Sequence, residues 1–236
     1  MYTILPFEKD FYENKHNYPV HYVGHSLLDA IETFKKNQSV DFRGVYGLDD
    51  RPIIALLPGS RKQEISKLLT EMLRIVDSYP QFQFIIAGAP SLNADFYKPF
   101  IKQENVQLIL NDTYNLLNNS HAAIVTSGTA TLETALFNVP QVVVYKGNEI
   151  SYQIAKRVIK LKYISLVNLI MDEQIVTELI QKECNTANIK KEFDKVINNL
   201  DRSKMLAKYH ELSELLGGGG ASERVINIIK KTLRTF

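Results

Sequence analysis

Residues 53–64 read IIALLPGSRKQE, a run that passes from wholly apolar to strongly charged. It begins with five apolar residues, Ile53 to Leu57, turns at Pro58 and Gly59, and leads into a segment with a one-sided apolar stripe. The stripe consists of Ile65, Leu68, Leu69, Met72, Leu73 and Val76. A short apolar run is typical of a buried β-strand, and apolar residues three or four positions apart predict an amphipathic helix. The run therefore predicts a strand, a tight turn and a helix.

The same alternation continues along the central part of the chain. Further apolar, β-branched runs lie at Phe82 to Ala87, Val106 to Leu110, Ala122 to Thr126 and Gln141 to Tyr145. Strands that are apolar throughout must be covered on both faces, and strands that alternate with helices favour parallel pairing. We predict an α/β fold, a Rossmann-like parallel sheet with helices on both faces, over about residues 25–185.

The two ends of the chain differ from this core. Residues 1–28 are rich in Tyr, His, Phe and Pro and hold one short strand candidate, Val20 to Val23. The stretch from Asn188 onward has a helical pattern, interrupted by four glycines from Gly217 to Gly220. Because glycine disfavours helix interiors, we predict a flexible joint between two helices there. The alternative, a phosphate-binding loop, lacks the preceding strand and the following Lys-Ser/Thr pair.

Composition excludes several classes of function. The 28 basic and 26 acidic residues leave a net charge of +2, which gives no global reason to expect nucleic-acid binding. The single cysteine, Cys184, cannot form an intrachain disulfide. His16, His21 and His25 lack the accompanying ligands of a metal site, so no metal is expected. Without a leader pattern or an apolar span of about 18 residues, we expect a cytoplasmic protein.

The turn after Leu57 is the first candidate binding site. Gly59 permits a tight turn where a strand ends, and the backbone N–H groups of the next helix then point at the turn. Arg61 adds a guanidinium, a bidentate hydrogen-bond donor suited to phosphate, and Ser60 lies beside it in the sequence. The alternative is an ordinary strand–helix turn with a solvated arginine. No Gly-x-Ser-x-Gly elbow surrounds Ser60, so acyl-transfer hydrolysis is not supported.

The second candidate follows the strand that ends near Val125. The small residues Ser127, Gly128 and Thr129 allow a ligand to approach the backbone at a helix N-terminus. Glu133 lies one turn inside that helix, where a carboxylate can accept two hydrogen bonds from a ribose diol. The alternative is a helix capped by Thr129 with a solvated Glu133. We favour binding, because a cap alone would not require the run of Ser, Gly and Thr.

Two further segments are weaker signals. Asn168 lies between apolar residues, and such an asparagine is often buried and satisfied by backbone. The segment from Ser151 to Lys162 is basic and amphipathic if helical, which suits either anionic lipid head groups or a solvated helix face. No Gly-x-Gly-x-x-Gly motif is present, which argues against a nicotinamide cofactor.

In combination these stretches resemble the lipid A disaccharide synthase family. The matching segments are Ile4 to Glu8 with Phe11 and Tyr12, Val23 to His25 with Leu27 to Asp29, Leu56 to Arg61, Ser127 to Glu133, Ala155 to Arg157, Tyr163 to Leu169, Glu178 to Gln181, and Glu183 with Cys184. Each segment is short, but their order is specific and they cover nearly the whole chain.

The resemblance implies a GT-B architecture, in which two Rossmann-like lobes enclose the active site. It implies transfer of diacylglucosamine from UDP-2,3-diacylglucosamine to lipid X, giving the lipid A disaccharide 1-phosphate and UDP, with inversion at the sugar carbon and without a cofactor or metal. Ser60 and Arg61 would face the diphosphate, which Ser127, Gly128 and Thr129 would hold. Glu133 would bind the ribose and Asn168 would face the donor pocket.

The resemblance also implies a division of the chain. Residues 1–28 would be the end of the N-terminal lobe and the linker, residues 29–185 the UDP-sugar-binding domain, and residues 186–236 a C-terminal helical segment. Family members have a lobe before the segment at Ile4 that carries the acceptor site and the general base, so no catalytic base is assigned here. We expect this chain alone to bind UDP without turnover.

The resemblance further implies peripheral association with the inner membrane and a homodimer, since members exchange C-terminal segments. Two alternatives stay open. The chain can belong to another UDP-sugar GT-B enzyme, such as the peptidoglycan N-acetylglucosaminyltransferase or a UDP-sugar epimerase. It can also be a fragment that only binds nucleotide.

Overall fold

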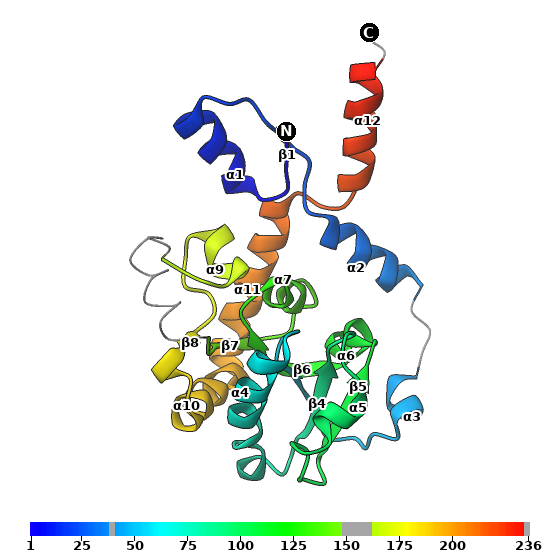
Figure 1. Cartoon of the computed structure of the whole chain (residues 1–236), viewed down its shortest axis with the longest axis vertical. Helices are drawn as coiled ribbons and strands as arrows, with labels where there is room; N and C mark the ends of the chain where they lie inside the picture. Colours follow the sequence, from blue (N-terminus) through cyan, green and yellow to red (C-terminus); the bar gives the residue numbers. More distant parts are fainter. Residues whose placement is uncertain (38–40, 148–161, 234–236) are drawn as a thin grey trace. The chain divides into compact units, whose positions relative to one another are not determined.

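The computed structural model describes residues 1–37, 41–147 and 162–233 (Figure 1). The chain divides into two compact units. Unit 1 combines both ends of the chain, residues 1–39 and 208–236, and unit 2 comprises residues 40–207. The predicted functional division at residues 28 and 185 stays a prediction.

Unit 2 contains a six-stranded sheet whose strands are all parallel. Its strands are β3 (Ile53–Leu57), β4 (Gln83–Gly88), β5 (Val106–Leu110), β6 (Ser120–Thr126), β7 (Gln141–Tyr145) and β8 (Glu178–Ile180). Their spatial order is β5-β4-β3-β6-β7-β8, so the chain grows outward from β3 in one direction and then from β6 in the other. This reversal between β3 and β6 is the point at which open α/β sheets bind ligands.

Within the described residues, the helical segments of unit 2 lie between these strands or flank them. They are α3 (Phe42–Tyr46), α4 (Lys62–Leu73), η2 (Val76–Ser78), α5 (Ala94–Tyr97), α6 (Thr113–Asn118), α7 (Thr129–Leu136), α9 (Leu166–Met171), η3 (Gln181–Glu183) and α10 (Thr186–Ile197). A further helix, α11 (Asn199–Leu216), spans the boundary between the units.

The core of unit 2 explains why its strands are apolar on both faces. Ile54 and Leu56 of β3 pack in one cluster with Leu68 of α4 and Phe193 of α10. The residue between them, Ala55, is equally buried but points to the other face, because side chains alternate along a strand. Helices α6 and α7 contact the sheet as well and bring buried leucines that lie outside this cluster. The predicted Rossmann-like α/β fold, with helices on both faces, is confirmed.

One strand of the unit 2 sheet was not predicted. β8 has only three residues, begins with the charged Glu178, and pairs with the last residues of β7. The sequence offers no apolar run there, because an edge strand this short buries little side chain. The predicted basic segment, apart from Lys162, lies outside the described residues. Among the described helices, none combines the length and the apolar character that a membrane span requires.

Unit 1 is built from segments far apart in sequence. Its elements are β1 (Tyr2–Thr3), α1 (Pro6–Asp10), the π-helix η1 (Phe11–Lys15), β2 (His21–Tyr22), α2 (Ser26–Lys36) and α12 (Ala221–Leu233). β1 and β2 form a short parallel pair, and α12 packs against α2.

The glycine run in unit 1 lies between α11 and α12, so the predicted joint between two helices is confirmed, while its flexibility stays a prediction. Hydrogen bonds hold the end of the run. The carboxylate of Asp29 accepts hydrogen bonds from the N–H groups of Gly220, Ala221 (3.3 Å) and Ser222 (3.1 Å). Arg224 donates to the carbonyl of Val23 at 2.7 Å. The N–H groups of Gly220, Ala221 and Ser222, at the start of α12, are thus occupied by a side chain of the protein itself.

Candidate functional site

Two turns lie next to each other at the carboxyl edge of the sheet. Leu57, the last residue of β3, pairs with Val125 of β6, so the segments that follow them leave the sheet side by side. The first segment carries Ser60 and Arg61, and the second carries Ser127. The fold therefore brings both predicted phosphate-binding turns to the reversal point of the strand order.

The first turn depends on glycine. Gly59 has a φ of +109°, and a Cβ atom there would lie 2.5 Å from Oε2 of Glu64. Glu64 in turn accepts a hydrogen bond from the hydroxyl of Thr126 at 3.3 Å, which links the first turn of α4 to the end of β6. Ser60 and Arg61 are exposed, and Arg61 is the N-cap residue of α4. The N-terminus of α4 and Arg61 thus lie at the same end of the sheet, an arrangement that attracts anions.

The second turn is held by its backbone and by one hydroxyl. The N–H of Ser127 donates to the carbonyl of Val144 at 3.0 Å, and its hydroxyl donates to the carbonyl of Ile164 at 2.8 Å. Gly128 is the N-cap residue of α7, and no atom would lie within 4 Å of a Cβ added to it. Gly128 and Thr129 are exposed. A ligand can therefore reach the backbone at the positive end of α7.

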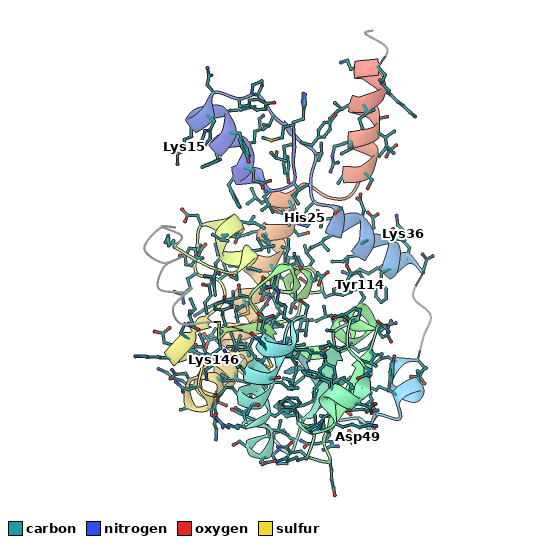
Figure 2. All side chains as sticks on the ribbon, in the orientation of Figure 1. Lys15, His25, Lys36, Asp49, Tyr114 and Lys146 are labelled. Carbon is teal, nitrogen blue, oxygen red and sulfur yellow. The ribbon has the colours of Figure 1, made fainter. Side chains whose placement is uncertain are left out.

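Glu133 is half-buried on α7 and contacts Tyr114 of α6, which is labelled in Figure 2. The tyrosine hydroxyl donates to Oε1 of Glu133 at 3.4 Å. Burial raises the pKa of Glu133, and the hydrogen bond from Tyr114 offsets part of this rise. Burial, together with the neighbouring carboxylate, raises the pKa of Tyr114 to about 12, so the phenol stays a donor. Tyr114 was not predicted from the sequence, because only the fold brings α6 beside α7.

Asn168 is fully buried, and its amide is bonded within the protein. Its Nδ2 donates to the carbonyl of Val176 and to Glu178, both at 2.9 Å. Its Oδ1 accepts from the N–H groups of Ile175 at 2.8 Å and Val176 at 3.0 Å. These contacts do not bring the amide to the exposed turns, and they give Asn168 a role in holding the backbone. The direct contact with a donor that the resemblance implied stays a prediction without support from this geometry.

A basic hollow adjoins the first turn. Its volume is about 370 Å³, and its lining includes the cations Arg61, Lys62, Lys67 and Lys146 with one carboxylate, Glu64. Lys146 follows β7 and is labelled in Figure 2. Its ammonium lies 2.9 Å from Glu71 and also donates to the carbonyl of Cys184. The excess of positive charge suits an anionic ligand.

The acidic partner of Lys146 is held ionised. Burial alone would raise the pKa of Glu71, but the contacts with Lys146, Arg74 and Thr186 lower it. The ion pair of Lys146 and Glu71 was not predicted from the sequence, because the two residues lie far apart along the chain. Within the described residues no cluster of three His, Cys, Asp or Glu side chains could hold a metal ion.

Comparison with known proteins assigns the family. The sequence profile described as Lipid-A-disaccharide synthetase matches residues 1–228. Proteins named lipid-A-disaccharide synthase are 36% identical over 236 residues in Coxiella burnetii strain CbuG_Q212 and 34% identical over 242 residues in Geobacter sulfurreducens. These alignments cover 97% and 99% of this chain but only 61% and 62% of the relatives, so the chain spans about three fifths of their length.

Solved structures share the fold at low sequence identity. The UDP-GlcNAc 2-epimerase of Neisseria meningitidis, bound to UDP-GlcNAc, has a TM-score of 0.63 and 18% identity, covering 92% of this chain and 58% of that one. The UDP-GlcNAc 2-epimerase of Methanocaldococcus jannaschii has a TM-score of 0.59 and 12% identity, covering 98% and 61%. At these identities the likeness concerns the GT-B-type fold alone. The profile match along nearly the whole chain is the decisive comparison, and the chain belongs to the lipid A disaccharide synthase family.

Proposed function

We propose that this chain is the UDP-binding part of a lipid A disaccharide synthase. The observation that carries the proposal is the pairing of the turns at Arg61 and Ser127 where the strand order reverses. The reaction would transfer diacylglucosamine from UDP-2,3-diacylglucosamine to lipid X, giving the lipid A disaccharide 1-phosphate and UDP. Membership of the family supports this choice of substrates.

Different residues would bind different parts of the donor. Arg61, with Ser60 beside it and the N-terminus of α4 behind it, would stabilise the charge of the diphosphate. Ser127, Gly128 and Thr129 would contact the diphosphate through backbone and hydroxyl groups at the N-terminus of α7. Glu133, held by Tyr114, would accept hydrogen bonds from the ribose hydroxyls.

The same groups would serve the chemical step. Negative charge grows on UDP as its bond to the sugar breaks, and donors that are already fixed stabilise that charge without reorganising. The excess cations of the hollow beside Arg61 would add to this effect. The general base and the lipid acceptor site would lie in the part of the family's length that this chain does not span.

Several finer assignments belong to this proposal. Residues 29–185 would form the donor-binding domain, flanked by the inter-lobe linker in residues 1–28 and the helical segment in residues 186–236. The enzyme would act at the cytoplasmic face of the inner membrane as a peripheral protein, because both substrates carry acyl chains. A homodimer is the proposed assembly.

Calorimetric titration with UDP tests the proposal, with ADP as the comparison ligand. We expect the chain to bind UDP selectively. The affinity should fall at least tenfold in Arg61→Ala and in Glu133→Ala, because each variant removes one charged hydrogen-bonding partner of the ligand. Lys102→Ala and Glu104→Ala, which remove an exposed base and an exposed acid just before β5, are the matched controls. Equal affinity for UDP and ADP, or full affinity in both site variants, would contradict the proposal.

A further inference from the structure

The carboxylate of Glu178 accepts four hydrogen bonds from one short stretch of chain. The N–H groups of Ile164 and Ser165 donate to it at 2.9 Å each, the hydroxyl of Ser165 at 2.7 Å, and the amide of Asn168 at 2.9 Å. Glu178 lies level with Val143 in the sheet, near the carboxyl edge. Such charge-assisted bonds are about twice as strong as neutral ones. Glu178 therefore fixes the backbone just before α9.

The same stretch of backbone reaches the proposed diphosphate site through one contact. Ile164 donates its N–H to Glu178 and accepts the hydroxyl of Ser127 on its carbonyl at 2.8 Å. Ser127 is also bonded through its own N–H to Val144. The position of the Ser127 side chain thus depends on where Glu178 holds the peptide groups of Ile164 and Ser165.

We propose that Glu178 is a positioning residue, which acts through Ile164 and Ser127 to preorganise the turn at Ser127–Thr129 for a diphosphate. The inference rests on the proposed function. Glu178 does not touch the ligand, and it sets how firmly the turn is held before the ligand arrives. A fixed turn binds the diphosphate without first having to order itself.

The test compares Glu178→Gln, Ser127→Ala and the double variant with Glu183→Gln, which makes the same charge change at an exposed site nearby. A glutamine at position 178 has only one side-chain oxygen, and its NH2 group would face the N–H and O–H donors of Ile164, Ser165 and Asn168, which would lose acceptors. We expect Glu178→Gln to weaken UDP binding about tenfold, the equivalent of one lost hydrogen bond to a charged group. The affinity for uridine, which lacks the diphosphate, is expected to stay within about twofold by ligand-observed NMR. A purely structural role would not change the ratio of the two affinities.

Two further measurements separate the positioning role from general damage. In the Ser127→Ala background, Glu178→Gln is expected to cause little additional loss of UDP affinity, because the link it acts through is already broken. In the unliganded protein, amide hydrogen exchange over residues 126–131 is expected to be faster in Glu178→Gln and unchanged in Glu183→Gln.

The outcomes are distinct. If Glu178→Gln lowers the melting temperature but keeps the UDP affinity of the unaltered chain, the positioning role is overturned. If the unaltered chain binds no UDP, the proposed function fails, and the exchange measurement then decides alone. Faster exchange over residues 126–131 in Glu178→Gln supports the positioning role, and unchanged exchange overturns it.

Discussion

The hydroxyl of Thr126 donates to Oε1 of Glu64 at 3.3 Å, and this bond joins the two turns of the proposed donor site. Thr126 is the buried last residue of β6, and Glu64 lies in the first turn of α4. The carboxylate also lies against Gly59, where a Cβ atom would be 2.5 Å from Oε2. Glu64 therefore links the start of α4 to the strand that precedes the second turn, and its carboxylate fills the space beside Gly59.

Removing that bond should weaken ligand binding as well as lower stability. Thr126→Val keeps the volume of the side chain and removes its hydroxyl. We expect the free energy of unfolding to fall by about 0.5–1.5 kcal/mol, the net value of one hydrogen bond, and UDP binding to weaken several-fold. Denaturant titration and calorimetry measure the two effects. Thr70→Val, which removes a hydroxyl bonded to Ser66 on the same helix, should leave UDP affinity unchanged. Equal loss of affinity in both variants would show that the bridge has no special role.

Gly59→Ala should destabilise unit 2 and displace Glu64. The φ of +109° is unfavourable for alanine, and the added Cβ would push against the carboxylate. We expect a loss of about 1–3 kcal/mol in the free energy of unfolding, the usual range for a strained non-glycine residue. Gly47→Ala is the comparison, because Gly47 also has a positive φ of +62° but no atom within 4 Å of the added Cβ. The larger loss should occur in Gly59→Ala, and the reverse order would contradict the argument.

The raised pKa of Glu133 predicts a pH dependence of stability. Since the pKa in the folded chain lies above the usual 4.5, the unfolded chain releases this proton more readily. The resulting stability is present below the unfolded pKa and is lost as pH rises through the folded pKa. Glu133→Gln should lack this loss and melt at a higher temperature than the unaltered chain at neutral pH. Melting temperatures between pH 4 and pH 8 measure this loss, and the same pH dependence in the two proteins would count against a pKa of Glu133 raised by burial.

The same carboxylate predicts how acid changes ligand binding. Ionised Glu133 accepts two hydrogen bonds from a diol, and the protonated acid accepts fewer. UDP affinity should therefore decline on acidification at a higher pH than an ordinary glutamate would give. Because the phosphates of UDP also titrate, the relevant quantity is the ratio of affinities in the unaltered chain and in Glu133→Gln. A ratio that does not change with pH would exclude ionised Glu133 from the ribose contact.

Asp29 should control the stability of α12. Burial alone would raise its pKa, but the bonds from the N–H groups of Ser222, Gly220 and Ala221 lower it. The stability from this group is thus present above the usual pKa of 3.8 and is lost as pH falls through the lowered value. Asp29→Ala should remove about 0.5–2 kcal/mol, as the loss of other helix caps does. Faster amide exchange in α12 is the expected sign, with Lys36→Ala at the exposed end of the same helix as control, and unchanged exchange in Asp29→Ala would contradict the argument.

The sequence alone was sufficient to predict the strands that are apolar throughout and at least five residues long. The five apolar runs became β3 to β7, because a strand covered on both faces must exclude polar side chains. Asn168 shows what the sequence alone does not predict. Its type and neighbours are visible in the sequence, but its partners at Ile175, Val176 and Glu178 exist only after the chain folds back on itself. The roles of Tyr114 and Glu64 were hidden for the same reason.

Unit 1 has a consequence for how the protein is made. Asp29 and the N–H of Gly220, which it binds, are 191 residues apart in the sequence. At a synthesis rate of about 5–20 residues per second, the first segment would wait on the order of 10–40 s for its partner to leave the ribosome. Unit 2 is continuous in sequence and can fold during that interval. The segment around Asp29 therefore stays without its partners, the N–H groups of Gly220 to Ser222, until almost all of unit 2 has been synthesised.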